Sequence, residues 1–225
     1  MTAISTFLFL VFLRPEVPFL RDHGCAHEGA VSTRLGLPGI PEAAETVALA
    51  KDLALAEQTG ARVHFRGLSC GRSVAMLVEA QGRGVKASAD VSAHQLILTE
   101  AAVDGFDANC HVTPPLRTAE DRTALRAAVA RGDIAAICSD HQPHEEDAKL
   151  APFPATEPGI SALETLLPLT LGLVAEGEIG LSTAIERLTA GPAQILGLPL
   201  GRLDAGRAAD VCVFEPEAPW VVSAS

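Results

Sequence analysis

A carboxylate and two imidazoles stand close together at one place in this chain. Asp140, His141 and His144 directly follow the short apolar stretch 134–138, which predicts a buried strand. A carboxylate with imidazoles at the carboxyl end of a strand is typical of hydrolases that activate a metal-bound water. A polar surface loop with an exposed pair of histidines contains the same residue types. The cluster alone therefore leaves both interpretations open.

Other candidate residues lie elsewhere along the chain. His64 lies within the predicted strand 61–68, and His94 lies near the end of the predicted strand 85–91. Each could point into the same barrel opening or be a satisfied core histidine. Arg117 ends the rigid turn 113–117 and could clamp a carboxylate through its planar guanidinium, or could merely precede the next helix. Ser69 and Cys70 have no His and acid beside them, which argues against a nucleophile triad.

Strand-like and helix-like stretches alternate along the chain and would position these residues. Apolar runs predict strands, and stretches rich in Ala, Leu and Glu that end near Gly predict helices. The expected strands are 4–13, 61–68, 85–91 and 134–138, and the expected helices are 42–59, 73–81, 119–130, 160–175 and 182–190. This alternation predicts an α/β fold with a parallel sheet, whose site is built from loops at the carboxyl ends of the strands.

The end of the chain has a different character. Residues 201–210 are rich in turn formers, and residues 211–214 predict a short strand. We expect two parts, a barrel portion over 1–198 and a C-terminal β segment over 199–225 that belongs to a small flanking sheet.

Composition limits the possible partners and compartments. The chain has 225 residues, of which 48% are hydrophobic, and a net charge of −11, which argues against nucleic acid as a ligand. Its five scattered cysteines lack any CxxC spacing and indicate a reducing, cytoplasmic location. The apolar run 7–13 is too short to span a bilayer and has no basic residue before it, so we expect no membrane partner.

Four ordered motifs carry a family resemblance. The loop and helix at 28–45, the Val-Thr-Pro-Pro-Leu-Arg run at 112–117, the Cys-Ser-Asp-His-Gln-Pro-His run at 138–144, and the segments 188–193 and 201–210 resemble successive landmarks of bacterial dihydroorotases. The resemblance covers nearly the whole chain. Ordered motifs over such a length are more specific than any single one.

The resemblance implies a fold and a chemistry. The fold would be the C-terminal part, about strands 4 to 8, of a metal-dependent-hydrolase (β/α)8 TIM-type barrel. The activity would be the interconversion of dihydroorotate and N-carbamoyl-aspartate in de novo pyrimidine biosynthesis, with zinc as the expected cofactor. By motif match, the catalytic proton carrier is Asp140, and the substrate-binding residues are His144, Arg117 and Thr113. His94 and Asp140 would be remnants of the metal site.

Several positions depart from the family pattern. The family's His-x-His pair is absent, Val17 stands in the place of a liganding Asp, and Gly67 stands in the place of a liganding His. Gln95 replaces the neighbour of His94, and Thr113 replaces a substrate-binding Asn. A metal site that has lost most of its ligands should bind zinc poorly.

The departures favour a degenerate, noncatalytic protein, and members of this kind in the family act as structural partners of aspartate transcarbamoylase. Two alternatives stay open. One is an active zinc dihydroorotase or a related cyclic amidohydrolase of the hydantoinase or allantoinase kind, with a small-molecule substrate. The other is a non-functional gene fragment, because an incomplete parallel barrel would expose its edges.

Overall fold

The main sheet consists of parallel strands. The computed structural model describes residues 9–218 and 221, and its largest sheet has four strands in the order β1-β4-β5-β6. These are Leu10–Leu13 (β1), Arg62–Phe65 (β4), Ala87–Ser92 (β5) and Ala136–Cys138 (β6). Every neighbouring pair is parallel, as predicted. The part of the expected first strand before residue 9 lies outside the described residues.

A smaller sheet precedes the first long helix. Ala26–His27 (β2) and Gly39–Ile40 (β3) pair in parallel, and Ala30–Leu35 (α2) connects them. The short helix Pro18–Arg21 (α1) comes just before them. The sequence did not reveal these elements, because two-residue strands carry no periodic pattern of hydrophobicity.

Helices connect the strands and follow the last one. They are Ala43–Thr59 (α3), Gly71–Gly82 (α4), Ala93–Ile97 (α5), Ala119–Arg131 (α6), Leu166–Ala175 (α7), Leu181–Leu188 (α8) and Ala190–Leu196 (α9). Short 3-10 turns occur at Glu100–Val103 (η1), Ala108–Cys110 (η2), Glu146–Lys149 (η3) and Phe153–Ala155 (η4).

Local chemistry explains the helix ends. The α6 helix begins with a capping box in which Thr118 and Asp121 satisfy each other's backbone N–H groups. It ends at Gly132, and α3 ends at Gly60, each glycine in the left-handed conformation. The three helices predicted at 42–59, 73–81 and 119–130 are therefore confirmed.

The last two predicted helices need correction. The first begins only at Leu166, because residues 160–165 close against the segment after β6, where Ile160 forms a bridge with His141. The helix predicted at 182–190 ends at Leu188 as α8. Thr189 has a non-helical backbone, with a φ of −129° and a ψ of −80°, and α9 begins after it at Ala190.

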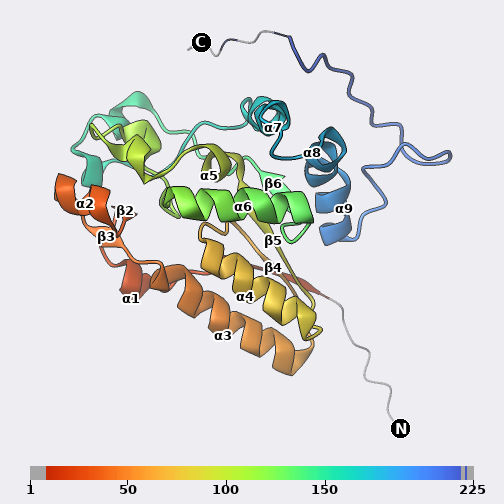
Figure 1. Ribbon diagram of the computed structural model, residues 1–225, viewed down its shortest axis with the longest axis horizontal. Helices are drawn as coiled ribbons and strands as arrows, with labels where there is room; N and C mark the ends of the chain where they lie inside the picture. Colours follow the sequence, from red (N-terminus) through yellow and green to blue (C-terminus); the bar gives the residue numbers. More distant parts are fainter. Residues whose placement is uncertain (1–8, 219–220, 222–225) are drawn as a thin grey trace.

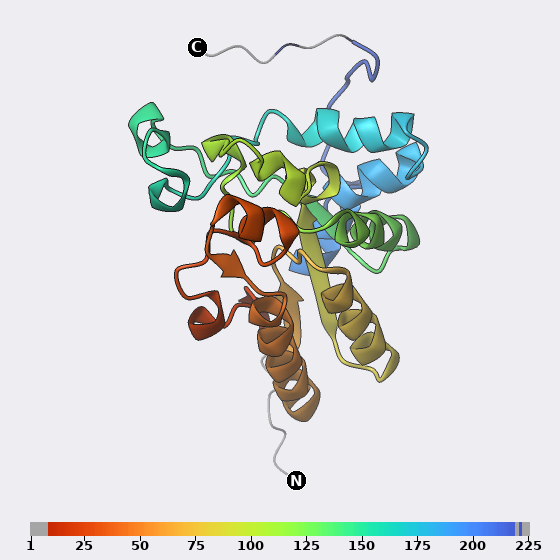
Figure 2. The same cartoon turned by 60° about the vertical axis from the view of Figure 1, so that its left-hand side comes forward.

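The hydrophobic core lies between one face of the sheet and the helices. Figure 1 shows α3, α4 and α6 side by side along the strands, and Figure 2 shows the same layer from another direction. Phe65 and Val91 on the strands are fully buried in one cluster with Leu49, Leu77 and Leu125 on these helices. Alternate strand residues point to the other face.

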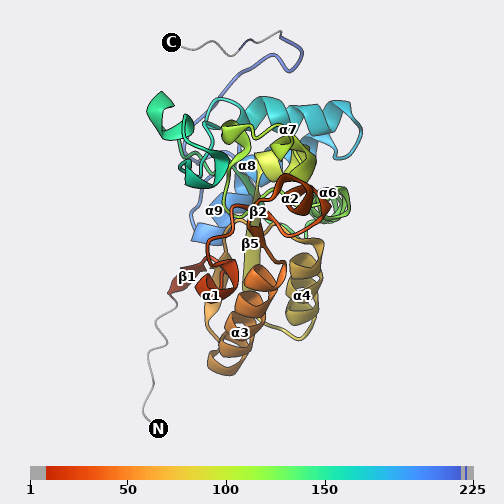
Figure 3. The same ribbon diagram turned by 90° about the vertical axis from the view of Figure 1, so that its left-hand side faces the viewer.

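The prediction of a strand at residues 211–214 is wrong for the described structure. Residues 199–218 contain neither helix nor strand, and Val213 is 92% exposed. Figure 3 shows this segment passing away from the helices. A strand requires a neighbouring backbone with which to hydrogen-bond, and this segment has none among the described residues.

The region between β5 and β6 also differs from a regular barrel repeat. Residues 105–118 form turns, a 3-10 helix and an extended segment, and β5 pairs directly with β6. The assignment of the sheet to strands 4 to 8 of a barrel, and the domain boundary at 198, stay predictions. No helix among the described residues is long and apolar enough to cross a membrane.

Candidate functional site

Asp140 and His94 both lie at the carboxyl end of the sheet. Asp140 follows β6 with a φ of 45°, and His94 lies just after β5, only 3% exposed. Burial lowers the pKa of His94 to about 4, while the negative charge of Asp140 acts in the opposite direction. Ser92 Oγ hydrogen-bonds His94 Nε2 at 2.9 Å, whereas His94 Nδ1 is buried without a hydrogen-bond partner in the described structure. The two residues predicted as remnants of a metal site are thus electrostatically coupled.

His141 and His144, which follow Asp140, hydrogen-bond to backbone groups of the segment before α7. His141 Nδ1 accepts hydrogen bonds from the backbone N–H groups of Ala162 and Leu163, at 3.0 and 3.1 Å. His144 is exposed, and its Nε2 donates to the carbonyl of Pro158 at 3.2 Å. His141 therefore anchors the segment before α7, and His144, predicted to bind substrate, lies at the protein surface.

Thr113 lies in a turn that neighbouring side chains hold in place. Its peptide bond to Pro114 is cis, and its carbonyl accepts a hydrogen bond from the guanidinium of Arg14. The side chain of Gln95 donates to the carbonyls of Pro114 and Pro115, at 3.0 and 3.1 Å. Gln95 thus stabilises the turn that presents Thr113.

Arg117 is a buried structural cation in this fold, with an exposed fraction of 2%. Its Nε donates to Ser69 Oγ at 3.0 Å, and its Nη1 reaches the carbonyl of Ile40 at 2.9 Å and His27 Nδ1 at 3.0 Å. The Glu45 carboxylate lies 4.0 Å from Nη2. Nε and Nη1 are thus engaged within the protein, and the role of Arg117 as a substrate clamp stays a prediction.

Glu45 completes this buried network. Its carboxylate accepts hydrogen bonds from the backbone N–H groups of Ser69 and Cys70 and from the hydroxyl of Ser69. A buried carboxylate needs such partners to compensate for lost hydration. The network joins α3, the loop after β4 and the segment before α6, and sequence reasoning missed it because its members are far apart in the chain.

His64 forms a buried pair with Asp90 that local sequence patterns do not predict. Its Nε2 lies 2.9 Å from Asp90 Oδ2, and its Nδ1 lies 2.8 Å from Ser88 Oγ. His64 is therefore a satisfied core residue, the simpler of the two interpretations above. Polar Ser88, Asp90 and Ser92 alternate with apolar or small residues along β5, and this period of two was the available signal that they share one face.

The described residues do not supply a full ligand set for the metal site that the resemblance implies. Gly67 adopts a φ of 64°, and its N–H donates to Asp90 Oδ1 at 2.7 Å. Val17 precedes α1, and its N–H donates to the carbonyl of Ala44 at 2.7 Å. Across residues 9–218 and 221, no group of three or more His, Cys, Asp or Glu side chains is arranged to hold a metal ion.

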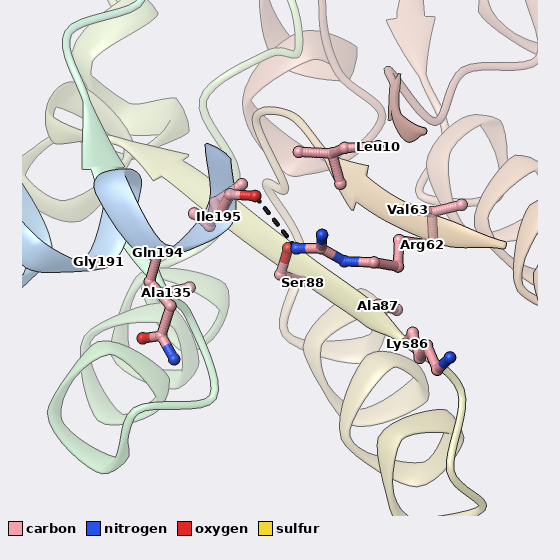
Figure 4. A pocket seen from close by; sticks show the side chains of 10 residues that line it. All are labelled: Leu10, Arg62, Val63, Lys86, Ala87, Ser88, Ala135, Gly191, Gln194 and Ile195. Carbon is pink, nitrogen blue, oxygen red and sulfur yellow. Dashed lines mark hydrogen bonds between the residues drawn. The ribbon is translucent and has the colours of Figure 1, made fainter. Parts of the chain in front are cut away.

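A separate pocket lies at the opposite end of the strands (Figure 4). It is lined by residues at the start of three strands, among them Leu10, Arg62 and Ala87, and by Ile195 of α9. Arg62 Nη2 donates to the carbonyl of Ile195 at 3.3 Å. In barrel enzymes the amino ends of the strands serve stability rather than chemistry, so we do not assign this pocket to the site.

Comparisons with known proteins agree with the fold and the motifs. The chain is 52% identical over 217 residues to a dihydroorotase-like protein of Pseudomonas putida, covering 96% of this chain and 51% of that protein. It is 45% identical over 199 residues to a dihydroorotase of Syntrophotalea carbinolica, covering 88% of this chain and 47% of the relative. The chain thus spans about half the length of the curated relatives that it matches.

Solved structures show the same fold. An L-hydantoinase from Arthrobacter aurescens superimposes with a TM-score of 0.79 at 23% identity, over 89% of this chain and 46% of that one. A D-hydantoinase structure matches with a TM-score of 0.70 at 28% identity, over 83% of this chain and 43% of that chain. The model of the amidohydrolase family matches residues 23–225. This chain therefore belongs to the amidohydrolase family.

Proposed function

We propose that this chain is a dihydroorotase-family protein of de novo pyrimidine biosynthesis that does not itself hydrolyse dihydroorotate. In this proposal it acts as a structural partner of aspartate transcarbamoylase. Its similarity to proteins named dihydroorotase-like supports the family part of the proposal.

The observation that carries the proposal is the conformation of Gly67. Its φ of 64° lies in the left-handed region, where a side chain is strained. The backbone at this position has adapted to glycine, and its N–H is bonded to the Asp90 carboxylate. A liganding histidine would have to occupy this strained position.

Among the residues that the structure describes, the ones that match the metal site of the resemblance are too few for the usual zinc chemistry. Catalytic zinc sites use three protein ligands and one open position. His94 and Asp140 supply two candidates, and Val17 cannot coordinate a cation. Because ligand count and geometry determine metal affinity, a site of this composition favours a protein that functions without zinc.

Elemental analysis of the purified chain, combined with a dihydroorotate assay, tests the catalytic part of the proposal. We expect less than one tenth of an equivalent of zinc, as an order-of-magnitude bound, and no turnover with or without added zinc. A sample that melts cooperatively would at the same time exclude an unfolded gene fragment. Stoichiometric zinc with turnover that a chelator abolishes would overturn the proposal.

Co-purification with aspartate transcarbamoylase from the same cells tests the partner. We expect a complex that survives gel filtration at about 0.15 M salt, where exposed charge pairs are largely screened. An equally acidic protein of similar size is the control for non-specific charge effects. Separate elution of the two proteins would contradict the proposed partnership while leaving the family assignment intact.

One observation favours an active cyclic amidohydrolase as the second candidate. His94 Nδ1 is buried without a hydrogen-bond partner among the described residues, and His94 senses the charge of Asp140. Orphaned imidazole nitrogens are suited to coordination. The zinc experiment with a chelator distinguishes the two candidates, because only the active enzyme would show turnover that the chelator abolishes.

A further inference from the structure

Three polar side chains form a hydrogen-bonded row on the face of the sheet opposite to Phe65 and Val91. His64 of β4 and Ser88 of β5 are partners in the parallel register, so their side chains share this face. His64 Nδ1 lies 2.8 Å from Ser88 Oγ, and His64 Nε2 lies 2.9 Å from Asp90 Oδ2. A hydroxyl, an imidazole and a carboxylate in this order are the parts of a serine nucleophile site.

The other contacts of Asp90 assign the protons along this row. Asp90 Oδ1 accepts from the N–H of Gly67 at 2.7 Å and from the thiol of Cys138 at 3.4 Å. As a carboxylate Asp90 can only accept, so the proton between Asp90 and His64 belongs to His64 Nε2. A neutral imidazole with its proton on Nε2 accepts at Nδ1. Ser88 then donates its hydroxyl proton to His64, which is the direction that activates a serine oxygen.

Burial and an aromatic neighbour hold the imidazole in place. The ring of Phe12 on β1 meets the ring of His64 edge-on, with centroids 5.1 Å apart. His64 is 2% exposed and Asp90 is 8% exposed, whereas Ser88 is half-buried and forms the more accessible end of the row. The two ring nitrogens are exchanged relative to the chymotrypsin arrangement, but such a triad is defined by geometry and roles.

Ser88 lines the pocket at the amino end of the strands (Figure 4). The pocket has a volume of about 320 Å³, within the range of sites that bind small molecules, and Arg62 lines it as well. Arg62 Nη2 donates to the carbonyl of Ile195 at 3.3 Å, and no carboxylate oxygen lies within 4.0 Å of Arg62 in the described part of the chain. Its other N–H groups can therefore stabilise an oxygen that becomes negatively charged.

We propose that Ser88, His64 and Asp90 form a site that hydrolyses small carboxylic esters in this pocket. Ser88 is the nucleophile, His64 is the general base, and Asp90 is a positioning residue. The site lies at the opposite end of the strands from His94 and Asp140 and uses no metal. It is therefore independent of the function proposed above.

The reaction has two balanced steps. Ser88 Oγ attacks the acyl carbon and its proton passes to His64 Nδ1, while the negative charge on the carbonyl oxygen faces Arg62. The bond from the acyl carbon to the alcohol oxygen breaks, and that oxygen takes the proton from His64. Water then attacks the acyl-serine and gives its proton to His64. The bond to Ser88 Oγ breaks, Ser88 recovers the proton, and the carboxylic acid leaves.

Covalent labelling with a fluorophosphonate tests the nucleophile. An activated serine oxygen bonds to phosphorus and displaces fluoride, so the intact mass of the folded wild-type chain should increase by one phosphonyl group, located on Ser88 by peptide mass spectrometry. Ser88→Ala should abolish the adduct. Ser182→Ala is the matched control, because Ser182 is an exposed serine on α8, and it should leave the labelling unchanged.

Hydrolysis of p-nitrophenyl acetate in the presence of a zinc chelator tests the turnover. Ser88→Ala should lower the rate above background about 100-fold or more, because the nucleophile is removed. Asp90→Asn should lower kcat about 10-fold or more with little change in KM, because Asp90 acts through His64 and does not touch the ester. A merely structural Asp90 would not produce this separation of kcat from KM.

A second serine variant separates catalysis from a folding defect. Ser88→Cys retains a nucleophile of similar size, and its thiol should become acetylated by p-nitrophenyl acetate in a chain that melts cooperatively. The absence of a phosphonyl adduct on the folded wild-type chain, or an adduct on a different serine, would show that the proposal is wrong. Equal ester hydrolysis by the wild type and Ser88→Ala would do the same.

Discussion

The backbone N–H of Gly67 donates to the Asp90 carboxylate at 2.7 Å, and this bond links the loop after β4 to the neighbouring strand. Oδ2 of the same carboxylate lies 2.9 Å from His64. The buried carboxylate of Asp90 on β5 thereby holds both His64 of β4 and the loop that follows β4. This chain therefore has at Gly67 a glycine turn that is held by a carboxylate.

Replacement of Gly67 by Ala should destabilise the fold by about 1 kcal/mol, because a side chain is strained at a φ of 64°. Space is not the reason, since an added Cβ would meet only Pro114 Cδ, at 3.9 Å. Urea denaturation measures the change. Gly82→Ala, at the end of α4 and without a positive φ, is the control and should be neutral or stabilising. Equal effects in both variants would contradict the argument.

Arg117→Lys should lower the free energy of unfolding by about 3 kcal/mol. Lysine keeps the charge but cannot reproduce the forked contacts with Ser69, His27 and Ile40. Chemical denaturation provides the measurement. Arg72→Lys, an exposed substitution, should change stability by less than about 0.5 kcal/mol. A tolerated Arg117→Lys would show that the network does not stabilise the fold.

His111 should make the fold less stable in mild acid. Its folded-state pKa of about 4 is below its ordinary value of 6.5, so the unfolded chain takes up the proton first as pH falls. This contribution is present above pH 6.5 and is lost progressively down to about pH 4. In thermal melts over this window, His111→Gln should lose stability less steeply than the wild type. His23→Gln, at an exposed site, should follow the wild type, and identical profiles for all three would refute the assignment.

The cysteine near the end of the chain should react with thiol reagents faster than the cysteines of the core. Cys212 is exposed, whereas burial raises the pKa of the Cys70 and Cys138 thiols. Because the thiolate is the reactive form, a thiol reagent at pH 8 should modify Cys212 first and the other two only after unfolding. Mass spectrometry of labelled peptides reads out the order. Cys212→Ser should remove the fast phase, and rapid labelling of Cys70 in the folded chain would contradict the described core.

The sequence by itself determined the parallel α/β class, the main strands and helices, and the family. It did so because hydrophobic periodicity and glycine caps are local signals, and because the motifs at 112–117 and 138–144 are read in order along the chain. The prediction that Val17 and Gly67 replace metal ligands rests on the family resemblance alone and stays a prediction.

Tertiary structure alone decided what the polar residues do. Arg117 became a buried partner of Ser69, 48 positions away, and His64 became a partner of Asp90, 26 positions away. Residues 211–214 have strand-forming side chains but pair with no strand in the described part of the chain, because a strand depends on a neighbouring backbone. Hydrogen-bond partners and sheet neighbours are set by long-range packing, so local residue patterns could not determine them.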